Sequence, residues 1–505
     1  MSAVYRPRRP RASPLWQIIH NGWDEFQSQY ESSYRKAHGP LRPEAVEVIE
    51  KFYRCGDLAQ GFTRFHCPDC GHEKLLAFTC KTRGYCPCCH QRKSIQTADW
   101  IASSVCFNVP HRQIVFTIPK VLRPIFRKRR KLLTLLFHVS IESLRDWMRT
   151  RLDLPGGQLA AIAAVQTFGD YLGFHPHLHV LCATGLVDSE NRFHLMPDET
   201  LAPLIELFRH RFIETLVREK LLSRKKADQM LSWKHSGFSL DAGDKPVSSY
   251  NIAGRRNLAE YMLRAPFSLE KVTWNEKAKK VIYRSKRSWH TKQNFQVFTA
   301  SDFIAATVEH IPPKSQQTIR YYGRYSNKRR GWDFKHSVRP PLMATLPKVE
   351  ERKQPLRQPE TLFILPAPEP KSHRALRPLW RDLILKTWGE DPQRCPCCKG
   401  KMKNVGTIVR FEEIEFFLRL HGLWEGIISL PPPPDPPFDI ETMEPLNVPI
   451  HWSWSDQTDP PPEDWWQDTP GEWEASELPL DDGYTLVLDG DDPHELADFP
   501  TFSVG

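Results

Sequence analysis

The sequence predicts an α+β protein, and three observations indicate that fold class. The apolar runs RQIVFTIPK, LAAIAAVQTFG and HLHVLCATG have the length and continuity of buried β-strands. Apolar residues recur at helical spacing through residues 15–54, and long helices are expected near residues 124–150 and 199–220. Paired cysteines ahead of the strands indicate a small metal-stabilised unit.

The predicted elements follow one another along the chain. The helical N-terminal stretch leads into a cysteine-rich segment, and the first strand, a basic amphipathic helix and two further strands come next. After the helix at 199–220, GRRNLAEYMLRAP predicts a shorter helix that Pro266 ends. KVTWNEKAKKVIYRS predicts a hairpin that turns at residues 275–278, and a helix near residues 299–310 precedes RYYGRYSNKRRGW.

A chain of 505 residues is too long for one core, so several units are expected. We expect a helical N-terminal segment, a zinc-binding module, a sheet domain, a proline-rich basic linker, a small unit around CPCC and an acidic, proline-rich tail. A tail of that composition buries too little apolar surface to fold, so we expect it to be disordered. The expected bounds are residues 1–54, 55–105, 106–334, 335–375, 376–430 and 431–505.

The formal charge of +10 conceals a strongly basic body. Residues 431–505 contain 19 Asp or Glu and no Lys or Arg. Residues 1–430 therefore hold all 70 basic residues against 41 acidic ones, a net charge of +29. Such a body favours polyanions, because each Lys or Arg that meets a phosphate releases condensed counterions. Nucleic acid is the expected partner, and a solvated basic surface is the alternative.

No apolar run approaches the roughly 18 residues that a membrane-spanning helix needs. The N-terminus, MSAVYRPRRPRASP, has basic residues but no apolar core after them, so we expect neither a secretory signal nor a membrane partner. A cytoplasmic location is therefore expected. In a reducing compartment, the twelve cysteines are more plausible as metal ligands than as disulfides.

Two cysteine pairs have the spacing of a zinc ribbon. Cys67 and Cys70 are followed, after fifteen residues, by Cys86 and Cys89. Four thiolates on one Zn²⁺ would leave no open coordination position, so the predicted site is structural. A second zinc ion or an exchange of ligands stays open, as do unmetallated buried cysteines; the spare candidates are Cys55, His66, Cys80 and Cys88. Cys395-Pro-Cys-Cys398 is only half a ribbon and is either a zinc knuckle or a cysteine-rich turn.

The stretch FHPHLH, residues 174–179, places histidines at alternate positions of a predicted strand. His177 and His179 would share one face, because residues i and i+2 of a strand point the same way. Two imidazoles so placed can hold one divalent ion. A bare His-x-His is expected by chance roughly once in a chain of this size, so satisfied core histidines are the alternative.

Several stretches resemble the rolling-circle transposases of the insertion sequence 91 family, which belong to the HUH superfamily of single-strand endonucleases. The resemblance runs from roughly Cys55 to Arg330. It rests on CGD (55–57), CPDCGH (67–72), CKTRGYCPCC (80–89), HPHLHVL (175–181), AEYMLRAPFSLEKV (259–272) and RYYGRYSNKRRG (320–331).

The resemblance implies a metal-dependent enzyme. His177 and His179 would bind Mg²⁺ or Mn²⁺, and Tyr261 would attack a DNA phosphate to give a 5'-phosphotyrosine intermediate. Many family members carry a second tyrosine four residues away, where this chain has Asn257. The chain therefore resembles a single-tyrosine variant, which nicks and rejoins single-stranded DNA in the cytoplasm, close to the nucleoid. The tyrosine would have to be reused or act in different subunits of a homo-oligomer.

Residues and resemblance together predict an α+β, HUH-type catalytic domain. Its antiparallel sheet would carry His177 and His179 on a central strand between flanking helices. Gln166, on the neighbouring strand, is the candidate third metal ligand, with Glu260 and Asp170 as rivals. Arg264 lies one helical turn after Tyr261 and could clamp the phosphate.

The stretch RYYGRYSNKRRG suits DNA contacts, because aromatic residues that can stack on unpaired bases alternate with cations. A packed helix end is the alternative. The candidate DNA-binding residues are Arg320, Tyr322, Arg324 and Arg329. A replication initiator of the same superfamily and a zinc-containing DNA-binding regulator without catalysis are the rival functions.

Overall fold

The computed structural model describes residues 10–82, 84–197, 200–243, 246–285, 294–343, 385, 391–428, 477–479 and 485–487. Most of the predicted linker and of the predicted acidic tail lies outside these residues. Within the tail, strands β15 (Glu477–Pro479) and β16 (Thr485–Val487) pair antiparallel. No helix in the described part of the chain combines the length and the apolar character that crossing a membrane requires.

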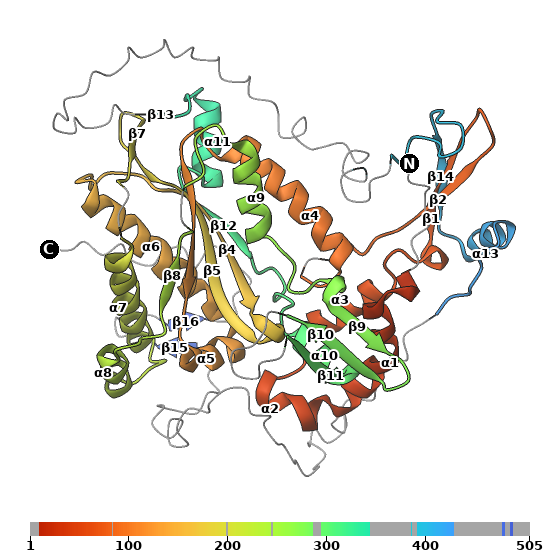
Figure 1. Ribbon diagram of the computed structural model, residues 1–505, viewed down its shortest axis with the longest axis horizontal. Helices are drawn as coiled ribbons and strands as arrows, with labels where there is room; N and C mark the ends of the chain where they lie inside the picture. Colours follow the sequence, from red (N-terminus) through yellow and green to blue (C-terminus); the bar gives the residue numbers. More distant parts are fainter. Residues whose placement is uncertain are drawn as a thin grey trace.

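A five-stranded antiparallel sheet forms the centre of the molecule (Figure 1). Its order is β12 (Ile319–Gly323), β4 (Ala160–Phe168), β5 (Phe174–Ala183), β3 (His111–Thr117) and β8 (Ser239–Asp241). Strand β5 is the middle strand and carries both His177 and His179. The predicted combination of helices with an antiparallel sheet, and the central place of the histidine strand, are thereby confirmed.

Successive side chains of β5 point to opposite faces of this sheet. Leu178 and Val180 enter the largest core, on the face covered by α5 (Arg123–Lys128), α6 (Leu133–Arg151), α7 (Ala202–Arg218) and α8 (Arg224–Ser232). His177 and His179 belong to the other face, where α4 (Pro87–Trp100) and α9 (Ile252–Met262) pack (Figure 1). The sheet is therefore apolar behind the histidines.

Two predicted helices differ from the sequence-based expectation. The basic helix near 124–150 is divided into α5 and α6, because Arg129 between them has a non-helical backbone (φ −121°, ψ 81°). Helix α9 ends at Met262, before the predicted stop at Pro266. The predicted hairpin forms between β9 (Val272–Asn275) and β10 (Lys280–Arg284), and the Ala278 N–H donates to the Asn275 side chain (3.0 Å).

The N-terminal helices form a second layer beside the sheet domain. They are α1 (Pro14–Gln29), a π-helical turn (Tyr30–Tyr34), α2 (Arg35–His38) and α3 (Pro43–Tyr53). They share a core with β9, β10, β11 (Phe295–Thr299) and α10 (Ala300–Val308). Helices α1 and α10 approach so closely at Gly22 that a Cβ there would lie 2.5 Å from Ala300 Cβ.

A separate three-stranded sheet projects at the right of Figure 1. Its order is β14 (Lys403–Ile408), β1 (Phe62–His66) and β2 (Glu73–Ala77), and α13 (Phe411–Leu420) packs beside it. Strand β14 comes from the predicted C-terminal unit, whereas β1 and β2 come from the predicted zinc module. The remaining elements are β6 (Gly185–Val187), β7 (Arg192–Leu195), α11 (Asn327–Lys335) and β13 (Leu342–Met343).

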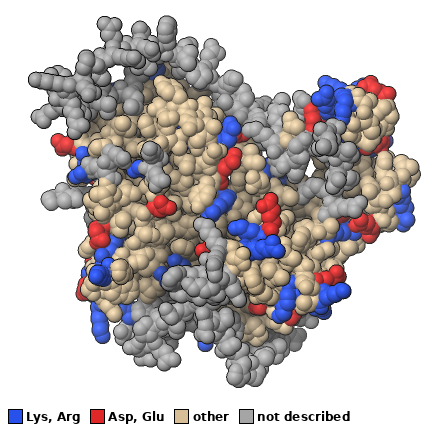
Figure 2. Space-filling model, in the orientation of Figure 1, with Lys and Arg blue, Asp and Glu red and all other residues tan. Residues whose placement is uncertain are grey.

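On the face that Figure 2 presents, Lys and Arg side chains are interspersed with Asp and Glu. Many described arginines also hold acidic partners, as Arg211 does with Asp146 and Arg224 with Glu214. The basic excess of the body therefore does not form one continuous patch on this face.

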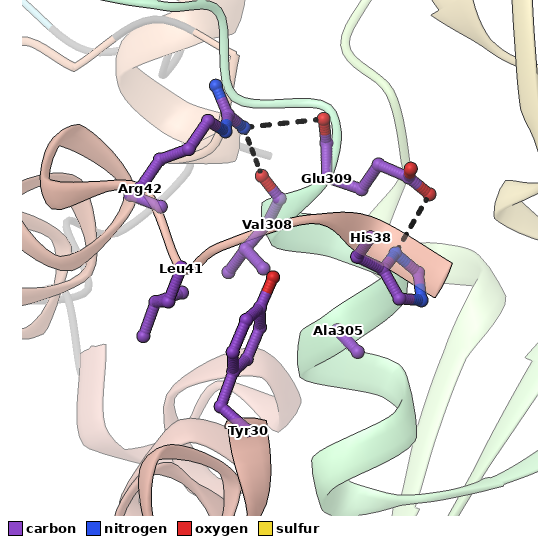
Figure 3. A pocket seen from close by; sticks show the side chains of 8 residues that line it. Tyr30, His38, Leu41, Arg42, Ala305, Val308 and Glu309 are labelled. Carbon is purple, nitrogen blue, oxygen red and sulfur yellow. Dashed lines mark hydrogen bonds and ion pairs between the residues drawn. The ribbon is translucent and has the colours of Figure 1, made fainter. Parts of the chain in front are cut away.

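A small pocket lies between the N-terminal helices and α10 (Figure 3). Glu309 lies at its wall with its side chain 3% exposed, 3.4 Å from His38 Nδ1. Two arginines of the α5–α6 connection also approach this carboxylate, Arg127 Nε at 2.8 Å and Arg130 Nη2 at 3.3 Å. Burial alone would raise the pKa of Glu309, but its three basic partners outweigh that effect and lower the pKa.

Replacing Glu309 by glutamine is expected to destabilise the protein by about 3 kcal/mol at neutral pH, because two arginines would lose their buried counter-charge. The lowered pKa means that the contribution of Glu309 is complete above its unfolded-state pKa of about 4.3 and is lost progressively as the pH falls from there toward its lower folded-state pKa. Urea unfolding at pH 7 and at pH 3 measures both effects. Glu214→Gln, on the surface, is the control, since exposed ion pairs contribute at most about 1 kcal/mol.

Candidate active site and cysteine clusters

A tyrosine lies against the predicted metal-binding histidines. The ring centroids of His177 and His179 are 4.9 Å apart, and the Tyr261 ring lies 5.6 Å from His179 at an interplanar angle of 80°. The histidines come from β5 and the tyrosine from the last turn of α9. Tyr261 is 49% exposed, so solvent and a large ligand can reach its ring.

The two imidazoles are oriented by bonds at Nδ1. His177 Nδ1 donates to the His175 carbonyl oxygen (2.7 Å), which leaves His177 Nε2 without a proton when the ring is neutral. His179 Nδ1 accepts from the Gln113 side-chain nitrogen (2.6 Å). His179 Nε2 is buried and has no hydrogen-bond partner among the described residues. Each ring thus has Nδ1 held by a hydrogen bond, and His177 presents an unprotonated Nε2, whereas His179 carries its proton on Nε2 in this arrangement.

Both histidines are neutral at physiological pH. Burial lowers the pKa of His177 to about 4 and that of His179 to about 3, and the charge of Arg264 adds to the effect in each case. A neutral imidazole can donate its lone pair to a cation, whereas a protonated one cannot. The neutrality of both rings meets one requirement for binding a metal ion.

Gln166 links the central sheet to α9, the helix that carries Tyr261. It stands opposite His177 in the register of β4 and β5. Its amide nitrogen donates to the Met262 carbonyl oxygen (2.8 Å) and to that of Tyr261 (3.3 Å), and Arg264 Nε donates to its amide oxygen (3.4 Å). Both ends of the amide are thus engaged with the end of α9. Its predicted role as the third metal ligand stays a prediction.

Three cations surround the histidines. The Arg264 guanidinium lies 4.6 Å from the centre of the Tyr261 ring. Arg123 acts electrostatically on His175 and His177, and Lys120 acts on His175. Sequence reasoning found Arg264 but missed Arg123 and Lys120, as well as Gln113. Their places became apparent only through the tertiary fold. Gln113 lies on β3, which pairs with the histidine strand, Lys120 follows β3 in a short turn, and Arg123 begins α5.

The other predicted DNA-binding residues lie away from this face. Arg320 and Tyr322 point to the opposite side of the sheet, where Arg320 donates to Thr134 (3.2 Å) and Tyr322 packs on the largest core. Arg324 is 3% exposed. Its side chain and that of Arg329 pair with Asp333, at 3.4 Å and 2.8 Å respectively. Arg320 and Tyr322 therefore lie on the other face of the sheet from Tyr261, and the DNA contacts expected of these four residues stay a prediction.

The predicted zinc ribbon is divided between two cysteine clusters. Cys86 and Cys89 lie with Cys55 and Cys80, whereas Cys67 and Cys70 lie with cysteines from the C-terminal unit. The expected grouping of Cys67, Cys70, Cys86 and Cys89 in one site is therefore corrected. Sequence spacing identifies each pair, but it cannot show which pairs meet. The second cluster consists of Cys67, Cys70, Cys395 and Cys398.

The first cluster has the donor set of a structural zinc site. Cys55 Sγ lies 3.7 Å from both Cys86 Sγ and Cys89 Sγ, and Cys80 Sγ lies 3.6 Å from Cys89 Sγ. Hydrogen bonds from Cys80 and Cys86 lower the pKa of Cys55 to about 7. Thiolates are the ligands that Zn²⁺ prefers, and four of them complete a tetrahedral shell. The residues present therefore fit a structural zinc ion.

Helix α4 links the first cysteine cluster to the end of α9, the helix that carries Tyr261. Cys86 and Cys89 lie at the start of α4, and two residues further along it reach the end of α9. Ser94 Oγ donates to the Leu263 carbonyl oxygen (2.7 Å). His90 Nδ1 accepts from the Gly84 N–H (2.9 Å), so its Nε2 donates to the same carbonyl (2.9 Å).

Comparisons with known proteins give matches to the part of the chain that carries the histidines and Tyr261, and to the part that carries the first cysteine cluster. The family model described as "Putative transposase" matches residues 160–331, which include the histidines and Tyr261. The model of the IS91 "Transposase zinc-binding domain" matches residues 20–118, which include the first cysteine cluster. This second match and the cysteine cluster together support structural Zn²⁺. No solved structure gives a significant match.

Two curated relatives are similar over most of the chain. The transposase for insertion sequence element IS801 of Pseudomonas savastanoi pv. phaseolicola is 26% identical over 394 residues, 73% of this chain and 85% of the relative. The putative transposase y4qJ of Sinorhizobium fredii (strain NBRC 101917 / NGR234) is 24% identical over 409 residues, 75% of this chain and 93% of the relative. The fold, the site and these matches define a transposase. The two family models and the IS801 relative together support an IS91-family transposase with an N-terminal zinc-binding domain.

Proposed function

We propose that this protein nicks and rejoins single-stranded DNA through a 5'-phosphotyrosine intermediate, in transposition of the rolling-circle type. The observation that carries the proposal is the contact of Tyr261 with His179 on the central strand of an antiparallel sheet. A solvent-accessible phenol lies next to a buried imidazole nitrogen that has no hydrogen-bond partner in the described part of the chain. Both matched relatives are transposases, which favours transposition over replication initiation.

His177 and His179 are the residues that would hold Mg²⁺ or Mn²⁺, each through Nε2. A bound divalent ion draws charge from a phosphate and aligns it for attack. His177 already presents Nε2 without a proton. His179 reaches the same state if Nδ1 carries the proton and the Gln113 amide turns its oxygen toward it, a rotation that leaves the amide's shape unchanged. Gln166 is the neighbouring amide from which an oxygen ligand could come.

The chain's own side chains would bind and position the scissile phosphate. Arg264, which stacks on Tyr261, suits a clamp on the phosphate oxygens. Arg123 and Lys120 extend the positive charge along the histidine strand. The phenol oxygen of Tyr261 attacks phosphorus, and the bond to the 3'-oxygen of the preceding nucleotide breaks. The phenol loses its proton and the departing 3'-oxygen gains one.

The covalent link conserves the energy of the phosphodiester. A 3'-hydroxyl can therefore attack the phosphotyrosine, release Tyr261 and join the strands without ATP. Tyr261 is the only tyrosine of α9, and Asn257 stands one turn before it. Two successive cleavages would need reuse of Tyr261 or a second subunit, so we expect a homo-oligomer at the element's ends.

A denaturing gel tests the proposal. Labelled single strands carrying the element's ends are incubated with the full-length protein and Mn²⁺, with and without EDTA. We expect a protein-bound band only with Mn²⁺, and a peptide containing Tyr261 that carries the nucleotide by mass spectrometry. A DNA-binding regulator would instead bind equally well in both conditions and give no covalent band, and that result would refute the proposal.

A further inference from the structure

We propose that Cys67, Cys70, Cys395 and Cys398 bind a second zinc ion, which joins two distant segments of the chain into one discontinuous zinc ribbon. The paired cysteines are 325 and 331 residues apart in sequence. The matched zinc-binding domain covers residues 20–118 and therefore includes only half of this site. The inference does not depend on the chemistry proposed for Tyr261.

The sulfur positions fit a tetrahedral ion. Cys67 Sγ lies 3.4 Å from Cys398 Sγ, and Cys70 Sγ lies 3.5 Å from Cys395 Sγ. All four sulfurs lie within 4.8 Å of one another. A tetrahedron of thiolates at about 2.3 Å from Zn²⁺ has sulfur–sulfur edges of about 3.8 Å. A disulfide would bring two sulfurs to about 2.05 Å, and these cysteines are free.

The two cysteine pairs form matching turns. The Cys67 N–H donates to the His72 carbonyl oxygen (2.9 Å), and the Gly71 N–H donates to the Cys67 carbonyl oxygen (2.9 Å). The second turn repeats both bonds at the same spacing. The Cys395 N–H donates to Gly400 (2.9 Å) and the Lys399 N–H donates to Cys395 (3.1 Å).

The two turns are also alike in backbone conformation and in the burial of their cysteines. Gly71 and Lys399 occupy equivalent positions, and both have positive φ, +72° and +63°. Lys399 adopts a left-handed backbone conformation, which is energetically costly for a residue with a Cβ. The first cysteine of each pair is buried and the second is exposed. Two unrelated segments have therefore adopted one ligand-presenting turn.

The turns face each other closely. Gly400 of the second turn lies against the Asp69 carboxylate of the first, so close that a Cβ on Gly400 would require the Asp69 side chain to shift. Each turn also leads directly into a strand of the shared sheet. The first lies between β1 and β2, and the second precedes β14, which pairs with β1.

The apolar core of this unit is too small to hold it together alone. The cluster under the turns contains only Phe65, Cys67, Cys395 and Met402, and five residues form the neighbouring cluster beside α13. Units of this size normally need a metal ion or a disulfide for stability. A Zn²⁺ ion on four thiolates supplies that stabilisation and fixes β14 to β1.

Zinc content of the full-length protein tests the site. We expect two Zn²⁺ per chain in the wild type, and one in Cys395→Ser/Cys398→Ser. Cys397→Ser is the matched control, because Cys397 lies between these ligands but outside the cluster, and it should retain two. Cys86→Ser/Cys89→Ser should separately lose the other ion.

Thiol labelling of the wild type provides a test that needs no variant. Cys395 and Cys398 should resist alkylation in the purified protein, become labelled after chelation, and become protected again when Zn²⁺ is added back. One zinc ion per chain in the wild type, or labelling of Cys395 and Cys398 that Zn²⁺ does not change, would overturn the inference. Cross-linked Cys67–Cys398 and Cys70–Cys395 peptides under non-reducing conditions would overturn it as well.

Discussion

Tyr261→Phe is expected to abolish the covalent protein–DNA adduct. The substitution removes the phenol oxygen, which is the proposed nucleophile, and leaves the ring that packs against His179 and under Arg264. Loss of a covalent nucleophile lowers turnover by more than about a thousandfold. The measurement is the intensity of the protein-bound band with Mn²⁺. Because Tyr261 is 49% exposed, the change should leave the unfolding free energy nearly unaltered.

Tyr250→Phe is the matched control for this experiment. Tyr250 lies just before α9 and is 77% exposed, and in the described part of the chain its ring contacts no histidine. Its replacement should leave the adduct intact. If Tyr261→Phe still formed the adduct, or if both variants lost it equally, Tyr261 would not be the nucleophile.

His179→Ala is expected to give the second largest loss. Only two histidines are proposed to hold the divalent ion, so removing one should reduce Mn²⁺-dependent cleavage by more than about a hundredfold while single-strand binding persists. Gln113→Ala should have a smaller effect, because it removes only the bond that orients His179. Loss of such an orienting partner typically costs about 10- to 100-fold in metal affinity.

The half-maximal Mn²⁺ concentration separates these two variants. Gln113→Ala should raise it and recover most activity at saturating Mn²⁺, whereas His179→Ala should not recover. His210→Ala, at an exposed position of α7, is the control and should behave as wild type. Equal cleavage by wild type and His179→Ala across the Mn²⁺ titration would exclude the proposed site.

The sequence predicted much of the fold, because the apolar runs are long and continuous. The three strands at the centre of the sheet were each recognisable from composition, and alternation placed His177 and His179 on one face. The sequence could not predict which strands neighbour one another. Gln113 is part of the site only because β3 pairs with β5, and a glutamine on a strand carries no signal by itself.

The cysteine grouping could not be predicted from local spacing, because metal ligands meet through the tertiary fold, here over separations of 325 residues or more. The basic stretch around β12 is divided for a local reason. Period-two alternation turns the side chains of Arg320 and Tyr322 to the opposite face from Tyr321, which belongs to the core beneath α4 and α9. Their DNA contacts stay a prediction.

The bonds from His90 and Ser94 to the Leu263 carbonyl oxygen bear on how this molecule can be divided. Leu263 directly follows the helix that presents Tyr261, so the N-terminal domain supplies the hydrogen-bond donors for that helix's end. A truncated chain beginning after α4 would leave this carbonyl group uncapped and its helix free to fray. The part of the chain that carries Tyr261 is therefore not separable at the boundary between the two matched domains, because a deletion made there would leave Tyr261 on a helix without its end contacts.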